Sequence, residues 1–356
     1  MAGALINKYG GFHNPVAKVL AGGQEIKATD GIYLERVEVT ASVDREPDMA
    51  VLVYRAFKLP QGTLEGLEKY FALGQRMEIK AGYGDCVSRI FLGYLHEIQV
   101  CDMAREYVEY LLVCLDVKGL MKKNRVYLTS GTAKAQQVFK DIVEDAGYGA
   151  LIEKKSIAAL PSGMNRACVI KGETHYDWLC GLAEYLDYEF FAGRGEMIFR
   201  RARMAGGEPM ELTREQGLRS SCLTASLTRQ TGRIQVQGHN RKDEIIVGTA
   251  KWEGIQKPFG DKIPRLLRNF ELSIWDMEME TGEQATQRAQ AIMKRISAEA
   301  VCMEAVNVGL PELEPGIRVK LGNDKVTSVS GTMYVKEVRH LLGQRGYQCI
   351  LKGVKV

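Results

Sequence analysis

The sequence predicts an α+β fold, mainly β, in which two similar β units flank an α/β section. Three observations support this prediction. Stretches of alternating apolar and polar residues, rich in β-branched and aromatic side chains, recur toward both ends of the chain. Helical patterns concentrate in the middle. A set of strand-like stretches in the first third is repeated at the end of the sequence.

The repeat is visible when residues 77–116 are placed on residues 317–356 without a gap. Eight positions are identical, and like-for-like apolar pairs lie between them. Two copies of one β unit in a chain indicate pseudo-symmetry, and pseudo-symmetric chains often build rings. The identical positions are Lys80/Lys320, Gly82/Gly322, Ser88/Ser328, Tyr94/Tyr334, Glu97/Glu337, Arg105/Arg345, Tyr107/Tyr347 and Leu111/Leu351.

Length and composition are those of a globular protein with two to three domains. The chain has 356 residues, of which 46% are hydrophobic and 26% charged. No run of about 20 apolar residues occurs, so we expect no membrane span, and the N-terminus lacks the pattern of a secretory signal. The cysteines form no CxxC motif, and we expect buried free thiols in a reducing compartment. They are Cys86, Cys101, Cys114, Cys168, Cys180, Cys222, Cys302 and Cys349.

The charge is uneven along the chain. Residues 1–118 hold 13 Lys and Arg against 16 Asp and Glu, a net of −3, whereas the remainder holds 35 against 28, a net of +7. A nucleic-acid patch is one interpretation. Solvated strand faces are favoured, because no binding motif accompanies the charge. The basic residues are densest at Arg194, Arg200, Arg201, Arg203, Arg229, Arg233, Arg241 and Lys242.

Residues 1–118 are expected to form a compact, mostly antiparallel β unit. Gly22-Gly23 predicts a tight hairpin, Glu46-Pro47-Asp48 predicts a break between strands, and residues 63–72 have the pattern of a short helix. The strands are expected at 16–26, 33–44, 49–57, 76–84, 88–102 and 105–117.

Residues 119–206 have a mixed pattern of helices and strands. Apolar residues recur at helical spacing, and Thr and Gly stand where helix caps are expected. The section therefore predicts an α/β domain inserted between the β units. The expected elements are a helix at 132–147 closed by Gly147, a strand at 167–172, a helix at 175–188 capped by Thr174, and a hairpin at 188–200 turned by Gly193 and Gly195.

Residues 207–356 return to strands and are expected to form the second β unit. An irregular loop at 254–270, with Pro and Gly, and a helix at 282–300 capped by Thr281 are expected as insertions within it. The strands are expected at 222–230, 233–252, 300–310, 317–322, 332–340 and 346–356.

With this layout the chain resembles the baseplate hub proteins of contractile phage tails and related injection machines. The group includes the late control protein D family and the hub portion of type VI secretion spike proteins. The resemblance runs over nearly the whole chain, although each motif is mainly strand and turn chemistry. The stretches that carry it are 34–54 (LERVEVTASVDREPDMAVLVY), 74–85 with 89–100 (GQRMEIKAGYGD, RIFLGYLHEIQV), 172–199 (GETHYDWLCGLAEYLDYEFFAGRGEMIF) and 313–353 (from LEPGIRVKLGN to GYQCILKG).

The resemblance implies two β-barrel-like hub domains side by side, and three chains that close a ring with pseudo-six-fold symmetry. Such a ring is a symmetry adaptor between a hexameric tail tube and a trimeric spike. The strands of the sequence end at Val356, so the spike is expected to be a separate protein. The implied partners are the chain itself as a homotrimer, a tail tube or tube-initiator protein, the spike, other baseplate proteins and a tape measure in the lumen. The implied location is cytoplasmic during assembly, then the baseplate of a virion or extracellular contractile particle.

Repeat and resemblance together predict that the repeated strands supply barrel wall and ring contacts, with the α/β section outside the ring. We expect no metal site, because none of the five histidines shows HxxxH or HExxH spacing. We expect no catalytic or cofactor site, because no GxSxG elbow, P-loop or GxGxxG motif follows a strand. The predicted wall and contact residues are Met77, Ile79, Gly82, Tyr94, Glu97, Tyr107, Ile317, Val319, Gly322, Tyr334, Glu337 and Tyr347.

Two other functions stay open. A tail-associated cell-wall hydrolase needs paired carboxylates, and a nucleic-acid-binding module would use the basic middle of the chain. The candidate carboxylates fall on or beside the predicted helix at 174–187, where capping and solvent-face charges are expected. An aromatic cluster in the same section is interpreted as core rather than as a stacking platform. The carboxylates are Glu173 with Asp177 and Glu184 with Asp187, and the aromatic residues are Trp178, Tyr185, Tyr188, Phe190 and Phe191.

Overall fold

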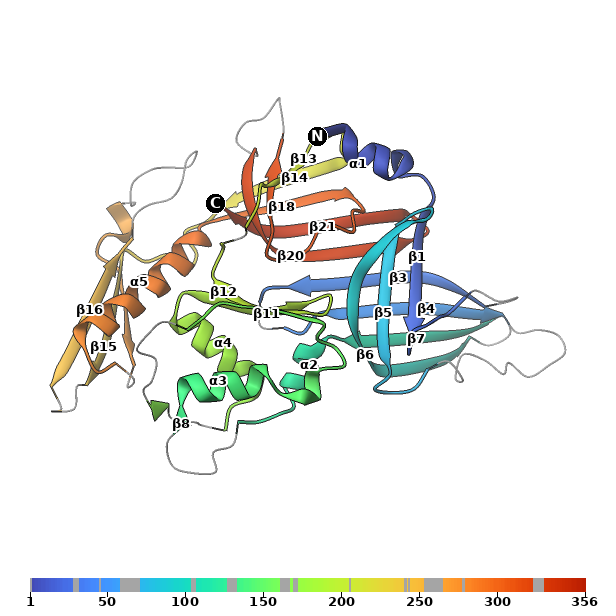
Figure 1. The fold of residues 1–356 in the computed structure, drawn as a ribbon. Helices are drawn as coiled ribbons and strands as arrows, with labels where there is room; N and C mark the ends of the chain where they lie inside the picture. Colours follow the sequence, from blue (N-terminus) through green and yellow to red (C-terminus); the bar gives the residue numbers. More distant parts are fainter. Residues whose placement is uncertain are drawn as a thin grey trace.

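The computed structural model of the chain is dominated by one large β-sheet (Figure 1). Smaller mixed sheets and five α-helices accompany it among the described residues. In this part of the chain no helix is long and apolar enough to cross a membrane. The structure describes residues 2–27, 32–44, 46–57, 71–103, 107–126, 133–160, 167–168, 172–204, 206–239, 242, 244–252, 265–276, 279–322 and 330–356.

The large sheet combines strands from both ends of the chain. All its pairings are antiparallel except that of β13 with β19. Its first-half strands are β1 (Pro15–Ala21), β2 (Gln24–Glu25), β3 (Ile32–Ser42), β4 (Met49–Phe57), β5 (Arg76–Tyr83), β6 (Cys86–Met103) and β7 (Tyr107–Leu115). Its second-half strands are β13 (Met210–Leu212), β14 (Leu218–Ala225), β18 (Val301–Val308), β19 (Arg318–Leu321), β20 (Gly331–Gly343) and β21 (Gly346–Lys355).

The strand order defines two wall units. The first wall unit is β3-β4-β7-β6, and the second wall unit is β14-β18-β21-β20. They are not separate sheets, because β20 pairs with β3 and joins them edge to edge. Among the described strands the pairings follow an open path from β14 to β2. In Figure 1 the second wall unit lies above β3, β4 and β7.

The two wall units are equivalent residue by residue. Both long hairpins, β6–β7 and β20–β21, carry a register shift at the same place, between Leu95 and Glu97 and between Val335 and Glu337. Tyr94 and Tyr334, each one residue before the shift begins, therefore hold matching positions. The ladder partners run Thr40–Met49–Leu115–Tyr94 across the first unit and Thr224–Cys302–Val354–Tyr334 across the second.

This equivalence corrects the ungapped repeat in its last strand. The hairpin ends at the pair Met103–Tyr107 in the first unit but at Gly343–Gly346 in the second, one residue shorter. Tyr107 therefore corresponds to Gly346, and the identity Tyr107/Tyr347 is out of register by one. Burial agrees, because a one-residue slip exchanges the two faces of a strand. The buried residues are Tyr110, Leu112 and Cys114 in β7, and Tyr347, Cys349, Leu351, Gly353 and Val354 in β21, where Cys349, Leu351 and Gly353 are the equivalents of the three in β7.

The pairings also reveal a second repeat. Thr40 and Thr224 are equivalent, and around them the sequence VTASVDR of residues 39–45 matches LTASLTR of residues 223–229. The matching serines make the same turn: Ser42 Oγ accepts from the Asp44 N–H at 2.8 Å, and Ser226 Oγ accepts from the Thr228 N–H at 3.1 Å. The similarity between β3 and β14 is thus present in sequence, pairing and turn geometry.

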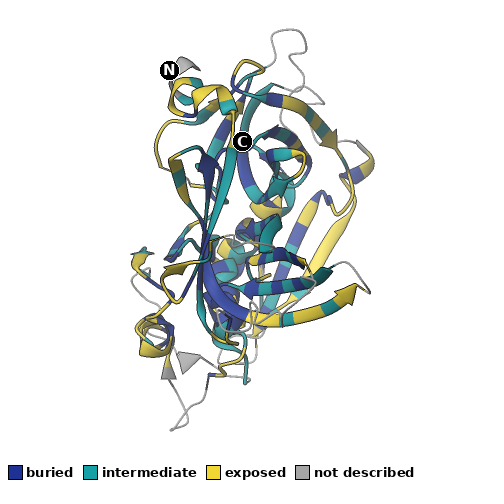
Figure 2. Cartoon of the chain, turned by 90° about the vertical axis from the view of Figure 1, so that its right-hand side faces the viewer, coloured by how far each residue is buried: buried dark blue, intermediate teal, exposed yellow. Residues whose placement is uncertain are grey.

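One face of the wall is buried in the main hydrophobic core. It packs against β1, β5, the first half of β6 and β19, and the core includes Val39, Leu52, Leu112, Val338 and Leu351. An aromatic group of Tyr9, Phe12, Tyr83 and Tyr347 joins the N-terminal segment to both halves of the sheet. Figure 2 shows buried positions in the middle of the molecule and exposed ones on the N-terminal helix α1 (Ala2–Lys8).

The α/β section has its own core below the wall (Figure 1). As predicted, Thr174 caps a helix, accepting from the Asp177 N–H, and a hairpin follows. Its turn is Arg194-Gly195, so the expected role of Gly195 is confirmed, whereas Gly193 is the last paired residue of the first strand. The predicted C-cap Gly147 is wrong, because the preceding helix ends at Val143 and has Glu144 as its C-cap. The elements are α2 (Val117–Met121), β8 (Ala133–Lys134), α3 (Ala135–Val143), β9 (Lys154–Ile157), β10 (Ala167–Cys168), α4 (His175–Tyr185), β11 (Tyr188–Gly193) and β12 (Glu196–Arg201).

Residues 233–298 form a further unit that the sequence did not separate. The expected strand region 233–252 does not join the large sheet. It supplies β15 and β16, which form a three-stranded sheet with β17, in the order β16-β15-β17, packed on α5 with its own apolar cluster. Thr281 caps α5 with a full capping box, as predicted. The elements are β15 (Arg233–His239), β16 (Ile245–Lys251), β17 (Glu271–Trp275) and α5 (Gly282–Ala298).

Some expectations have different outcomes or none. The helix expected at 63–72 lies almost wholly outside the described residues, as does most of the loop expected at 254–270. The domain limits 1–118, 119–206 and 207–356 stay a prediction. The expectation that the cysteines are buried is wrong for part of the set: Cys114, Cys180 and Cys349 are buried, whereas Cys86, Cys222 and Cys302 are exposed and Cys101 is half-buried.

Candidate subunit interface

The residues predicted as wall and contacts divide by burial. Six of them have side chains in the core of the chain, so they can build the wall but cannot contact another subunit. Glu97 and Glu337 lie at matching positions beyond the register shift and are accessible. Gly82 is buried, and Ile317, Gly322 and Tyr107 are half-buried. The six core residues are Met77, Ile79, Tyr94, Val319, Tyr334 and Tyr347.

The internal seam is the pairing of β20 with β3, from Glu337–Ser42 to Leu342–Val37. The Val43 N–H donates to the Lys336 carbonyl at 2.9 Å, which fixes the alternation of hydrogen-bonded and non-hydrogen-bonded pairs along the ladder. His340 and Val39 therefore form a hydrogen-bonded pair, and their N–H groups point across the seam.

The inner face of the internal seam is dry. Val37 is 1% exposed, Val39 and Val338 are 0% exposed, and His340 is 2% exposed. The His340 Nε2–H donates to the Leu313 carbonyl at 3.1 Å, and Nδ1 accepts from the Tyr347 hydroxyl at 2.8 Å, so the neutral ring is satisfied on both sides. Burial lowers the pKa of His340 to about 3, which keeps this ring neutral.

The outer face of the internal seam is polar. Arg339 and Glu38 pair across it at 2.5 Å, and Arg55 lies 2.8 Å from Glu35 and 3.3 Å from Glu109 on the neighbouring strands. A hollow of about 630 Å³ follows this face over β3, β4, β7 and β20. The chain's own elements cover the apolar face of the wall and leave the charged face to water.

Two strand edges end the wall. The β6 edge is residues 97–101, beyond the last partner of β6 in β5; the β14 edge is residues 222–226, on the side away from β18. Among the described strands neither edge has a ladder partner. By the equivalence of the units, the β6 edge corresponds to the β20 side of the internal seam, and the β14 edge to its β3 side.

The side chains on these edges occupy positions equivalent to those of the internal seam, but they are more exposed. Val100 stands where His340 stands and is 50% exposed, and Ile98 and Leu223 are half-buried where Val338 and Val39 are fully buried. An unpaired strand edge with apolar side chains is a site for pairing with another chain. The β6 and β14 edges were not identified as a pair from the sequence. The signal that could have done so is the match of residues 39–45 with residues 223–229, which relates β14 to β3.

The equivalent tyrosines fasten the wall to the α/β section in different ways. The Tyr334 hydroxyl donates to Glu189 at 2.6 Å, and Glu189 also accepts from Arg200 at 2.8 Å. Burial raises the pKa of Tyr334. The Tyr94 hydroxyl is buried beside Gly119 and Asp116 and has no hydrogen-bond partner within the described part of the chain.

The two units also end differently. At the end of the first unit Lys118, fully buried, lies 2.5 Å from Asp48 and 3.7 Å from Asp116 and donates to the Ser42 carbonyl at 3.1 Å. Burial acts against the charged form of Lys118, but the two carboxyl groups outweigh it and raise its pKa. Burial raises the pKa of Asp116 well above the ordinary carboxyl range. The geometry fits an ion pair of Lys118 with Asp48, with the Asp116 carboxyl group as a second, more distant neighbour of the ammonium group.

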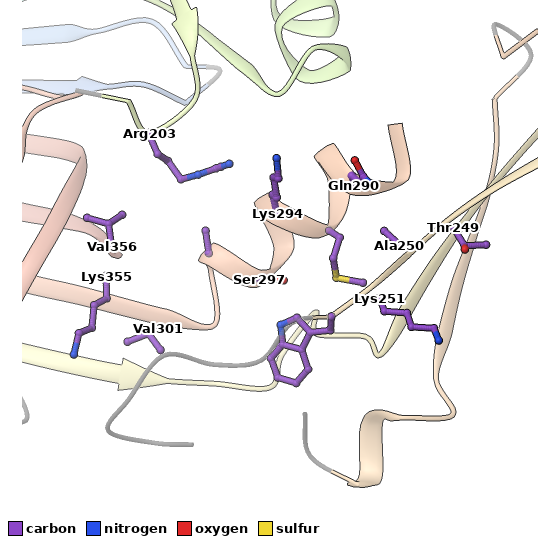
Figure 3. Close-up of a pocket in the computed structure, with 13 residues that line it drawn as sticks. Arg203, Thr249, Ala250, Lys251, Gln290, Lys294, Ser297, Val301, Lys355 and Val356 are labelled. Carbon is purple, nitrogen blue, oxygen red and sulfur yellow. The ribbon is translucent and has the colours of Figure 1, made fainter. Parts of the chain in front are cut away.

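The second unit ends at a cleft of about 790 Å³ between β21, α5 and β16. Figure 3 shows Arg203, Lys251, Lys294 and Lys355 around it. Asp187 pairs with Arg203 at 3.0 Å and lies 3.8 Å from Lys294, so part of this charge is compensated within the chain.

The charged groups proposed for the other functions are largely engaged. Of the basic residues, Arg194 pairs with Glu314, Arg200 with Glu189 and Arg233 with Glu271. Of the carboxylates, Asp177 belongs to the cap of α4, Glu184 pairs with Arg295 at 3.1 Å, and Asp187 is held as described above. The aromatic residues Trp178, Phe190 and Phe191 are core, as predicted.

The fold is shared with phage tail proteins. The chain is similar to a tail protein from Neisseria meningitidis MC58 (TM-score 0.72, 12% identity, covering 96% of this chain and 97% of that one). It is also similar to the 43 kDa tail protein of prophage MuSo2 from Shewanella oneidensis (TM-score 0.72, 15% identity, covering 96% and 98%). No protein-family model and no curated protein sequence matches the chain.

A secretion-system protein has the same fold. An Escherichia coli component of the type VI secretion system, itself described as structurally similar to the T4 bacteriophage tail proteins gp27 and gp5, matches with a TM-score of 0.57 and 11% identity over 95% of this chain and 77% of that one. The resemblance to tail hub proteins read from the sequence is thus confirmed at the level of the fold.

Proposed function

We propose that the chain is a structural baseplate hub of a contractile tail or injection system. In this role three copies form a ring that joins a six-fold tail tube to a three-fold spike. The fold shared with tail proteins of Neisseria and Shewanella supports the proposal that the chain is a tail protein. The internal seam, which pairs two equivalent wall units within one chain, carries the proposal.

The internal seam supports a specific way for copies to join. The β6 edge is equivalent to the β20 side of that seam, and the β14 edge to the β3 side, so the β6 edge of one copy and the β14 edge of the next can repeat the same pairing. Such head-to-tail contacts form rings when the rotation closes. A continuous wall also removes both unpaired edges.

Three copies give six equivalent wall units, and this number matches a tube of six-fold symmetry. The charged face of the wall then lines a water-filled lumen, because the apolar face is covered by the chain's own core. Proposed partners are the tail tube or tube-initiator protein, a separate spike protein, other baseplate proteins and a tape measure in the lumen. The proposed location is the baseplate of the particle.

Burial supplies part of the driving force for closure. We call the proposed contact between the β6 edge of one copy and the β14 edge of the next the joint. Val100 and Leu223 are expected to face each other across the joint, as His340 and Val39 do in the internal seam. Full burial of one such side chain contributes about 1.5–3 kcal/mol. Ladder hydrogen bonds along 97–101 and 222–226 add to this and fix the register.

The proposal is tested by the mass and shape of the purified chain. We expect an assembly of three times the 39.7 kDa of one chain, seen as a closed ring in negative-stain class averages. Tube and spike proteins are added if the chain alone is monomeric. A chain that stays monomeric in their presence contradicts the proposal. Clearing of cell wall in a zymogram, lost on substitution of one carboxylate, would favour the hydrolase instead.

A further inference from the structure

We propose that Cys101 of one copy and Cys222 of the next form a disulfide across each joint of the ring. The proposal rests on the ring described above and deepens it, because it names a covalent bond that forms at the same joint. Both residues are free cysteines within one chain, Cys101 half-buried and Cys222 exposed.

The register follows from the internal seam. There Leu341 pairs with Glu38. The ladder partners that relate the two units place Cys101 at the position of Leu341 and Cys222 at the position of Glu38. A joint that repeats the internal seam therefore sets the two thiols directly opposite each other.

The pair type suits a disulfide. His340 and Val39 are a hydrogen-bonded pair of the internal seam, so the next pair along the ladder, Leu341–Glu38, is a non-hydrogen-bonded one. Residues opposite each other in such a pair have Cα atoms about 4.5 Å apart and side chains on one face. This separation lies within the range of about 4.4–6.8 Å found for disulfides.

Within one chain the two cysteines lie on strands that do not pair with each other. They lie on the first and last strands of the path β14-β18-β21-β20-β3-β4-β7-β6, and neighbouring strands are about 4.8 Å apart. A bond between Cys101 and Cys222 is therefore intermolecular. The equivalent pair of the internal seam, Leu341 with Glu38, has no thiol, so only the joints between copies can be locked.

Oxidation proceeds by thiol–disulfide exchange with a small-molecule disulfide, such as glutathione disulfide. The thiolate of one cysteine attacks it and releases one glutathione thiolate, giving a mixed disulfide; the second cysteine thiolate then displaces the other glutathione. Two protein thiols are oxidised, one glutathione disulfide is reduced, and the two thiol protons pass to the released glutathione. In a reducing compartment the joint stays open, and in oxidising surroundings each joint becomes covalent.

The experiment oxidises the full-length chain with glutathione disulfide, blocks free thiols with N-ethylmaleimide and separates the products on a non-reducing denaturing gel. We expect a band of three linked chains that reductant collapses to one, and a peptide that joins Cys101 to Cys222 by mass spectrometry. Cys101→Ser and Cys222→Ser each abolish the band. Cys302→Ser, at another exposed cysteine, leaves it unchanged.

Native mass of the same samples before oxidation separates the two proposals. A native three-chain ring without the Cys101–Cys222 peptide after oxidation overturns the disulfide and leaves the hub role standing. A linked band that persists in both Cys101→Ser and Cys222→Ser also overturns it. Absence of any three-chain assembly, alone or with tube and spike proteins, overturns the hub role itself.

Discussion

The two wall units have the same strands, the same register shift and the same Thr-Ala-Ser turn, yet they differ in what lies beside them. The β20 edge of the second unit is covered by β3, whereas the equivalent β6 edge of the first unit is open among the described residues. The equivalent residues His340 and Val100 differ accordingly in burial: His340 is 2% exposed and Val100 is 50% exposed. A duplicated unit paired once within a chain leaves one edge of each kind, and in the proposed ring these are the edges that pair between copies.

The largest expected loss of stability comes from a substitution in the buried charged cluster at the end of the first wall unit. Lys118→Met removes the cation from the buried end of the first unit and leaves Asp48 unpaired in an apolar setting. Breaking one partner of a buried ion pair costs about 3–5 kcal/mol. We expect the midpoint of chemical denaturation to fall accordingly, as followed by circular dichroism.

A matched control for this change lies four residues away. Lys122 pairs with Glu46 at 3.3 Å on the surface, and its loss in Lys122→Ala is expected to cost less than about 1 kcal/mol. Equal losses in the free energy of unfolding of Lys118→Met and Lys122→Ala would mean that the buried ion pair does not stabilise the first unit more than a surface ion pair does.

Substitutions of the equivalent tyrosines Tyr334 and Tyr94 are expected to change stability by less, and by different amounts in the two wall units. Tyr334→Phe removes a hydrogen bond to the buried carboxylate of Glu189, which is expected to cost about 1.5–3 kcal/mol. Tyr94→Phe removes a buried hydroxyl without a described partner, so we expect a change near zero or a slight gain. Thermal unfolding of the two variants measures both. A loss for Tyr94→Phe as large as that for Tyr334→Phe would contradict the assignment of different roles.

Much of the wall was predictable because strands and turns are local. The Gly22-Gly23 hairpin, the caps Thr174 and Thr281 and the strands of both repeats follow from local pattern. The unit around α5 was not separated, because β15 and β16 read like any other strand pair and their partner sheet is a tertiary choice. β17 was missed, since its five residues lie next to a stretch that reads as loop.

The candidate joint was only half predictable. A comparison at one fixed spacing finds β6 with β20, but it cannot find β3 with β14, whose spacing is shorter. It also misplaces β21 by one residue, because the shorter turn of the second hairpin is invisible without the pairings. Burial of Met77, Tyr94 and Tyr334 removed them as contacts, and no pattern in the sequence separates core wall from open edge.

The proposed ring requires the β6 edge of one copy to pair with the β14 edge of the next, and the native mass of Val100→Pro tests this pairing most directly. The N–H of Val100 points out of the edge, as that of His340 does in the internal seam. Proline removes this donor without taking a hydrogen bond from β7. Val100→Thr keeps the N–H and the β-branched shape and serves as the control.

We expect Val100→Thr to keep the three-chain mass, and Val100→Pro to give a folded chain of 39.7 kDa with association weakened at least ~10-fold, equivalent to about 1.4 kcal/mol. Circular dichroism and thermal unfolding confirm that Val100→Pro is folded. A folded Val100→Pro that still forms the three-chain ring with undiminished affinity would contradict the account.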